Sequence, residues 1–114
     1  RALDTLLAAV PEDECRIVLA HNPDSADTEY ESRVDLMLAG HTHGGQVRLP
    51  FYGALITLDR FGKRWESGHY RDMGAHLNVS RGIGCEPHVP RVRFLCRPEI
   101  VLIDIEGRQR RNAE

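Results

Sequence analysis

Two short apolar segments, each ending at histidine, constrain the fold of this chain most. RIVLA at 16–20 runs directly into His21, and DLMLAG at 35–40 runs directly into His41-Thr-His43. Neither segment alternates with polar residues, which is typical of strands covered on both faces of a parallel sheet. The carboxyl ends of neighbouring strands meet at one edge of such a sheet. We therefore expect all three imidazoles to lie in a single crevice.

Helical periodicity is confined to the start of the chain. Apolar residues at the i, i+3, i+4 and i+7 positions of one helix face are Leu3, Leu6, Leu7 and Val10. Pro11 predicts the end of this helix, because proline lacks the amide that a helix interior needs. The polar segment 27–34 is expected to form a second short helix, with Ser25 or Asp27 as its N-cap.

The chain changes character after Gly44 and Gly45, where short strand candidates are separated by Gly, Pro or Asp. The expected strands are 47–49, 54–58, 68–71, 76–80, 92–96 and 100–105. The order helix, strand, helix, strand and then a β-rich part indicates an α/β domain over residues 1–106. The polar segment 107–114 is expected to be a frayed tail.

Composition excludes several classes of protein. The 114 residues suit one domain, and a net charge of -2 provides no global basic field for nucleic acid. The apolar runs are too short to span a bilayer. The three cysteines are an odd number without C-x-x-C spacing, which argues against a disulfide framework and against a four-cysteine zinc site.

The H-x-H segment between glycines predicts a metal site, because neutral imidazole is a common metal ligand. Gly40 allows the chain to turn sharply off the strand, and Gly44 and Gly45 allow it to leave the site in the same way. In an extended backbone, His41 and His43 would share one face. In a turn they can diverge toward two different ions.

Two kinds of metal site remain open at this point. Three imidazoles can form a mononuclear zinc site with one open position. A two-metal hydrolytic site also needs carboxylates. The nearby carboxylates are Asp24, in an expected turn, and Asp35, at the start of a strand. Neither is a convincing bridging ligand.

Other polar residues are weaker candidates. Gln46 and Arg48 follow the histidine loop, and Arg81 lies in S-R-G-I-G, so each is a candidate for substrate contact. Solvated strand-edge positions explain Gln46 and Arg48 equally well. The remaining histidines have no matching partners in the sequence and are interpreted as ordinary surface or partly buried residues: His69, His76 and His88.

Four segments resemble the calcineurin-like metallophosphoesterases, and most closely their bacterial phosphohydrolase branch. They are IVLAHNPD at 17–24, VDLMLAGHTHGGQVRLP at 34–50, SRGIG at 80–84 and RFLCRPEIVLI at 93–103. The resemblance covers residues 1–106. It implies the C-terminal half of a four-layer αββα sandwich that hydrolyses phosphate mono- or diesters with two divalent metal ions (Mn, Fe or Zn) and a metal-activated water.

The resemblance also implies individual roles and reveals a departure. His21 and His41 look like ligands of one ion, and His43 looks like a ligand of the other. The Asp-x-His, Gly-Asp and Asn-His motifs of the family, which supply the bridging aspartate and the proton donor, do not occur in this sequence. We therefore expect the isolated chain to be inactive and to self-associate through the surface meant for its other half.

The expected setting follows the same resemblance. The substrate is expected to be a phosphorylated small molecule or a lipid-like phosphate ester, in the cytoplasm or at a membrane reached through a preceding N-terminal segment. A hypothesis from another class also remains open: a non-enzymatic metal-binding or interaction module.

Overall fold

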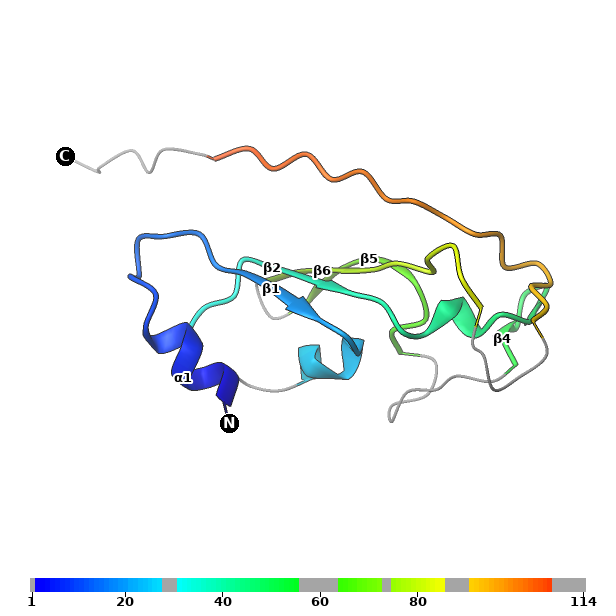
Figure 1. The fold of residues 1–114 in the computed structure, drawn as a ribbon, viewed down its shortest axis with the longest axis horizontal. Coiled ribbons are helices and arrows are strands. Elements are labelled where there is room, and N and C mark those ends of the chain that lie inside the picture. The colour runs from blue at the N-terminus through cyan, green and yellow to red at the C-terminus, as the bar shows by residue number, and fades with distance from the viewer. Residues whose placement is uncertain (1, 28–30, 56–63, 73–74, 86–90, 108–114) are drawn as a thin grey trace.

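A computed structural model describes residues 2–27, 31–55, 64–72, 75–85 and 91–107 (Figure 1). Its elements, in chain order, are the helix α1 (Ala2–Ala8), the strand β1 (Ile17–Ala20), the 3-10 helix η1 (Pro23–Asp27), β2 (Leu36–Ala39), the 3-10 helix η2 (His43–Gly45), β3 (Arg48–Leu49), β4 (Gly53–Ala54), β5 (Gly68–Asp72) and β6 (Ala75–Val79). This is a small mixed α/β arrangement. Within the described ranges, no helix is long and apolar enough to cross a membrane.

The main sheet has the strand order β1-β2-β6-β5. Strands β1, β2 and β6 are parallel, while β5 is antiparallel to β6. Ala20 lies opposite Ala39, and Ala39 lies opposite Val79, so the three parallel strands end level with one another. The predicted parallel pairing of the two apolar segments is confirmed. Strands β3 and β4 form a separate two-stranded ribbon.

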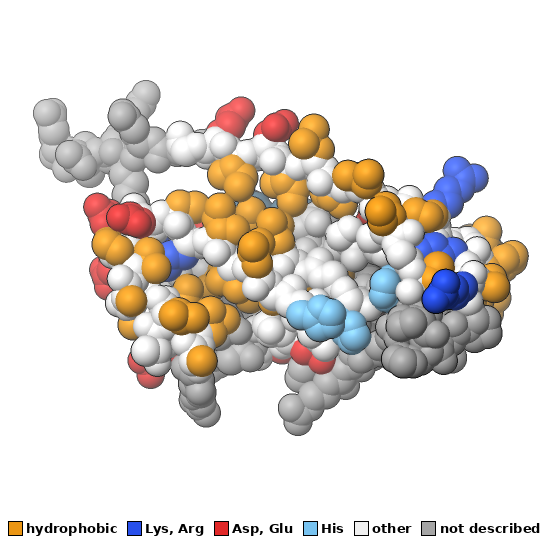
Figure 2. All heavy atoms as spheres, in the orientation of Figure 1, with side chains coloured by type: hydrophobic (Ala, Val, Ile, Leu, Met, Phe, Trp, Pro, Cys, Tyr) orange, Lys and Arg blue, Asp and Glu red, His pale blue; other side chains and the backbone are white. Residues whose placement is uncertain are grey.

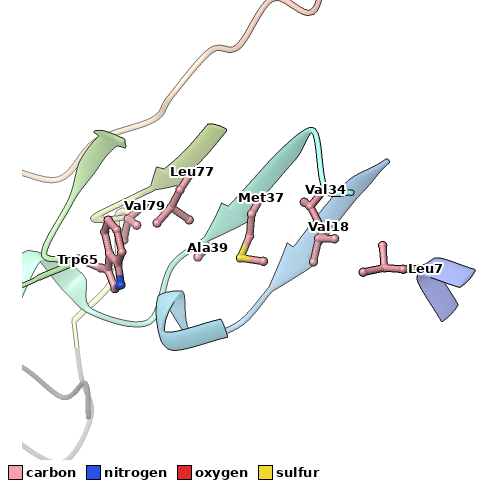
Figure 3. Close-up of a cluster of buried hydrophobic side chains, with 8 residues drawn as sticks. All are labelled: Leu7, Val18, Val34, Met37, Ala39, Trp65, Leu77 and Val79. Atoms are coloured by element: carbon pink, nitrogen blue, oxygen red, sulfur yellow. The ribbon is translucent and has the colours of Figure 1, made fainter. Parts of the chain in front are cut away.

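One face of the main sheet carries the hydrophobic core (Figure 3). The buried side chains of this core are Leu7, Val18, Val34, Met37, Ala39, Trp65, Leu77 and Val79. Helix α1 contributes Leu7, which lies on the predicted apolar face of that helix. The indole Nε1 of Trp65 donates a hydrogen bond of 2.6 Å to Asp27 Oδ2, so the buried ring has its polar group satisfied.

The opposite face of the sheet is open, which corrects the expectation that both faces are covered. Side chains alternate along a strand, so Val18 points into the core while Leu19 is 79% exposed. The segment 103–107 runs over this open face without pairing (Figure 1). Ile17 and Leu36 line a cleft together with this segment. Among the described residues, the helical cover lies only on the core side.

Two predicted strands in the last part of the chain are wrong. Residues 92–96 make only an isolated bridge, between Phe94 and Val47, and residues 100–105 are extended but unpaired. A strand needs a partner for its backbone amides and carbonyls, and none of the described strands pairs with residues 100–105. Leu102 is accordingly 89% exposed.

The second predicted helix lies earlier than 27–34. Asn22 Oδ1 accepts a hydrogen bond of 2.8 Å from the amide of Asp24, and this local turn starts η1 at Pro23. Residues 28–30 lie outside the described residues, as do residues 56–58 of the predicted strand 54–58 and residues 108–114 of the predicted tail. The predicted strands 68–71 and 76–80 are confirmed as β5 and β6.

Substitutions on the two faces of the sheet should have unequal effects on stability. Met37 is 3% exposed within the core, so Met37→Ala is expected to lower the free energy of unfolding by about 3 kcal/mol. Leu19→Ala on the open face of neighbouring β1 is the matched control, with an expected loss below about 0.5 kcal/mol. Urea unfolding of the 114-residue chain, at a concentration at which it is monomeric, measures both. Equal losses would contradict the one-sided core.

Candidate metal centre

Two of the three predicted histidine ligands lie together at the carboxyl end of the sheet. His21 directly follows β1, and His41 follows β2 after a single glycine. The amide of Gly40 donates a hydrogen bond of 3.3 Å to the carbonyl of His21, which ties the two strand ends to each other. The centroids of the two imidazole rings are 4.3 Å apart. Figure 2 shows histidine side chains accessible on this part of the surface.

The loop after β2 has a left-handed backbone at both of its histidines. The φ angles of His41 and His43 are 67° and 48°, so the segment is a turn and not an extended strand. The His43 ring lies beside Gly84. A Cβ atom added to Gly84 would be 4.0 Å from the His43 Cε1 atom. A turn is the arrangement in which the two imidazoles of an H-x-H segment can diverge.

The glycines of this loop do not share one role. Gly44 and Gly45 have positive φ angles of 62° and 75°, as glycines that turn the chain require. Gly40 does not have a positive φ angle. The sharp turn predicted at Gly40 lies one residue later, at His41. A non-glycine residue in this region costs about 1 kcal/mol or more, and such strain clusters at functional sites.

Thr42 and Cys96 fix the strained loop from its buried side. Thr42 is 1% exposed; its Oγ1 donates 2.7 Å to the carbonyl of Glu66 and accepts 3.2 Å from the amide of Gly44. Cys96 is 1% exposed, and its Sγ donates 3.2 Å to the carbonyl of His43. The histidine loop is therefore held through Glu66 and Cys96, which are far from it in the sequence.

The Arg93 guanidinium is a hub that joins three segments of the chain. It donates hydrogen bonds to carbonyl oxygens of Arg81 at 2.7 Å, Gly82 at 3.3 Å, His43 at 3.3 Å and Cys96 at 3.4 Å, and also to Gly84. Arginine suits this task because it has five donors and no acceptor. Nothing local in the sequence indicates the role, because the contact with His43 spans 50 residues.

The Arg81 side chain pairs with Glu99. Its Nε donates 2.9 Å to Glu99 Oε2, its Nη2 donates to the same oxygen, and its backbone amide donates 2.9 Å to Oε1. Hydrogen bonds from Arg81 hold the pKa of Glu99 below its usual value, and the same pairing raises the pKa of Arg81. The structure thus gives the guanidinium predicted to contact substrate a protein partner.

The other two predicted substrate contacts are Arg48, which is paired with a carboxylate, and Gln46, which is buried. Arg48 forms an ion pair of 2.9 Å with Glu66 Oε2 and donates 3.3 Å to the carbonyl of Gly44. Gln46 is buried, with a positive φ angle of 51°. Contact of Gln46, Arg48 and Arg81 with a substrate stays a prediction.

The donor set fits part of a metal centre. His21 and His41 offer two neighbouring imidazoles, which suit a divalent transition metal. Within the described parts of the chain, no group of three or more His, Cys, Asp or Glu side chains could hold an ion, so neither a three-histidine site nor a carboxylate-bridged site is assembled. Asp35 lies at the other end of β2, where it accepts 2.9 Å from the amide of Arg16.

Curated relatives match most of this chain. It is 43% identical over 91 residues to the uncharacterized metallophosphoesterase YkuE of Bacillus subtilis, covering 80% of this chain and 31% of that protein. It is 39% identical over 90 residues to the phosphodiesterase YaeI of Escherichia coli, covering 79% and 32%. It is 30% identical over 94 residues to the UDP-2,3-diacylglucosamine pyrophosphatase LpxG of Chlamydia trachomatis, covering 76% and 28%.

The chain spans about a third of the length of these relatives. No family model matches it, and no solved structure matches it significantly. The relatives that carry the name metallophosphoesterase, matched over about 80% of the chain, show that it belongs to the calcineurin-like metallophosphoesterase family. The resemblance inferred from the four sequence segments is confirmed. Members of this family generally use divalent metals.

Alanine substitutions should distinguish the glycines of the loop. A Cβ on Gly44 would lie 2.6 Å from Arg81 Cγ and 2.8 Å from Cys96 Sγ, at a φ angle of 62°. We expect Gly44→Ala to lower the free energy of unfolding by about 2 kcal/mol. Gly40→Ala is the matched control, because its Cβ would have its nearest neighbour at 4.0 Å. Chemical denaturation measures both; a larger loss at Gly40 would refute the assignment of the turn.

The Arg81–Glu99 pair should make stability depend on acid pH. Because the folded pKa of Glu99 is lowered from 4.5, its contribution is complete above about pH 4.5 and is lost as the pH falls through the lowered value. Glu99→Gln should cost about 2 kcal/mol at pH 7, and this difference from the unmodified chain should shrink toward pH 3. Urea unfolding across that range tests it, with the exposed Glu106→Gln as control. A cost independent of pH would contradict the pairing.

Proposed function

We propose that this chain is part of a metal-dependent phosphoesterase, in which a metal-activated water hydrolyses a phosphate mono- or diester. The adjoining His21 and His41 imidazoles, level at the carboxyl end of parallel strands, carry this proposal. The braced turn that aims His43 elsewhere supports it. The names of the relatives YkuE, YaeI and LpxG support the reaction class.

In this proposal the three histidines divide between two ions, which are Mn, Fe or Zn. His21 and His41 hold one ion, and His43 holds the other. The ions supply a nucleophilic hydroxide at neutral pH and charge stabilisation for the phosphoryl oxygens. The chain itself supplies the imidazole nitrogens and a turn fixed by Thr42 and Arg93, so the ligands are positioned before any ion binds.

The proposed domain is a four-layer αββα sandwich of which this chain forms the C-terminal half. The open sheet face with its exposed apolar side chains supports the proposal, because stacked sheets bury such a face against each other. Leu19 and Leu102, both strongly exposed, are the clearest examples. No carboxylate joins the histidines in the described residues, and we therefore propose that the 114-residue chain is inactive alone. The exposed apolar face leads us to propose that the chain self-associates.

The proposed substrate is a phosphorylated small molecule or a lipid-like phosphate ester. The phosphodiesterase and pyrophosphatase names among the relatives suggest this class. We place the enzyme in the bacterial cytoplasm or at a membrane. Gln46, Arg48 and Arg81 are the proposed substrate contacts. Arg48 and Arg81 are partly exposed and already paired with Glu66 and Glu99, and Gln46 is buried.

Loss of the loop histidines should abolish both metal binding and turnover. In the protein that contains this chain as part of a complete domain, His41→Asn with His43→Asn is expected to lower metal affinity and hydrolysis of bis-p-nitrophenyl phosphate by more than about 100-fold. Metal content and initial rates are the measurements, and His88→Asn is the control.

Two results would count against this proposal. Unchanged metal affinity in the double variant would remove the histidines from the site. Tight metal binding without hydrolysis of any phosphate ester in the unsubstituted protein would favour the non-enzymatic metal-binding module instead.

A further inference from the structure

A second pair of histidines meets on strands β5 and β6, apart from the histidine loop. His69 lies on β5 and His76 on β6, and the distance between His69 Nε2 and His76 Nδ1 is 3.0 Å. The ring centroids are 5.1 Å apart, with 39° between the planes. His76 is paired with Leu36 at the start of β2. The backbone of His76 is thus about 10 Å along the strands from the end of β2 at Ala39, whereas His69, opposite Asn78, lies one residue short of that level.

The spacing of the two nitrogens is that of two ligands on one ion. A transition metal binds imidazole nitrogen at about 2.0–2.1 Å, so nitrogens 3.0 Å apart subtend an angle of roughly 90° at a shared ion. That angle suits tetragonal Cu²⁺ or Ni²⁺. Without an ion, one ring donates its N–H to the other, and the tautomers decide which ring is the donor.

The position of the pair gives it rigidity and access. Both residues lie on the regular antiparallel ladder of β5 and β6, where His69 is opposite Asn78 and His76 is opposite Arg71. This ladder fixes the two Cβ positions, so the imidazoles need little further ordering to chelate an ion. His69 is exposed, which leaves solvent access for the ion and for water ligands.

The surroundings of the pair favour a cation. His69 and His76 line the cleft between the open sheet face and residues 103–107. The other charged residues that line this cleft are Asp13, Asp35, Asp104, Glu106 and Arg33. Four carboxylates thus line the cleft with one guanidinium, which is itself paired with Asp35 at 3.0 Å, and Arg71 opposite His76 adds a second positive charge, so negative charge remains in excess.

We propose that His69 and His76 form a two-imidazole chelate site for a divalent transition-metal ion, with water completing its coordination. The site is separate from His21, His41 and His43, and it does not depend on the proposed hydrolytic function. Within the described residues no third His, Cys, Asp or Glu ligand joins it, so its affinity should lie well below that of a closed structural site.

Copper binding provides the test, because Cu²⁺ has the highest affinity of the divalent series for such ligands. The background is His21→Asn, His41→Asn and His43→Asn, which removes the candidate metal centre. His69→Asn, His76→Asn and the double variant are compared in this background, with His88→Asn as the matched control. Titration gives affinity, and electron paramagnetic resonance gives the number of nitrogen ligands. Circular dichroism verifies the fold of each variant.

A chelate predicts a non-additive pattern. Either single substitution should weaken copper binding by more than about tenfold, since each removes the effective concentration of the second imidazole, and the double variant should bind little worse than either single one. The nitrogen count should fall from two to one in each single variant. Independent, additive losses, or binding unchanged by either substitution, would overturn the proposal.

A second design keeps the test decisive if the triple-asparagine background does not fold. The unsubstituted chain and the chain carrying only His69→Asn and His76→Asn are then compared for bound copper at saturation. The proposal expects the double variant to lose one equivalent while retaining binding at the other histidines. Equal stoichiometry in the two proteins would refute it.

Discussion

The in-register parallel pairing of β1 with β2 is the constraint on which the candidate centre depends. Ala20 lies opposite Ala39, so the two segments leave the sheet at the same level, and the ring centroids of His21 and His41 come to 4.3 Å from each other. A slip of one residue would place Val18 on the open face and Leu19 in the core. The hydrophobic pattern of β1 therefore fixes the position of a residue that takes no part in the core.

A second layer of interactions converts this proximity into a defined loop. Left-handed backbone at His41 and His43 is unfavourable, and it persists because the surrounding groups determine the conformation. Thr42 accepts a hydrogen bond from the amide of Gly44, and Cys96 and Arg93 both donate to the carbonyl of His43. Arginine is effective here because it satisfies several carbonyls at once and adds no acceptor that would itself need a donor.

The part of this architecture that sequence predicts is the part set by local pattern. RIVLA and DLMLA read as strands because uninterrupted apolar residues have few other stable arrangements, and the histidines after them follow from strand polarity. Residues 100–105 are similarly apolar but form no strand, because pairing requires a partner strand that the local pattern cannot reveal. The meeting of His69 with His76 escapes the sequence for a related reason, since it depends on the register of the β5–β6 hairpin.

The uncovered face and the candidate centre are linked through Glu99. Its carboxylate binds Arg81 beside the histidine loop, and its amide donates 3.1 Å to the carbonyl of Gly82. Beyond this anchor the chain runs extended toward the open face, where burial of a side chain such as Leu102 would contribute about 2 kcal/mol that the described structure does not use. Any protein layer that covers the open sheet face must therefore accommodate the segment after Glu99, whose direction is set beside the histidine loop. The Arg81–Glu99 ion pair thus connects the histidine loop to the segment that runs over the open face of the sheet.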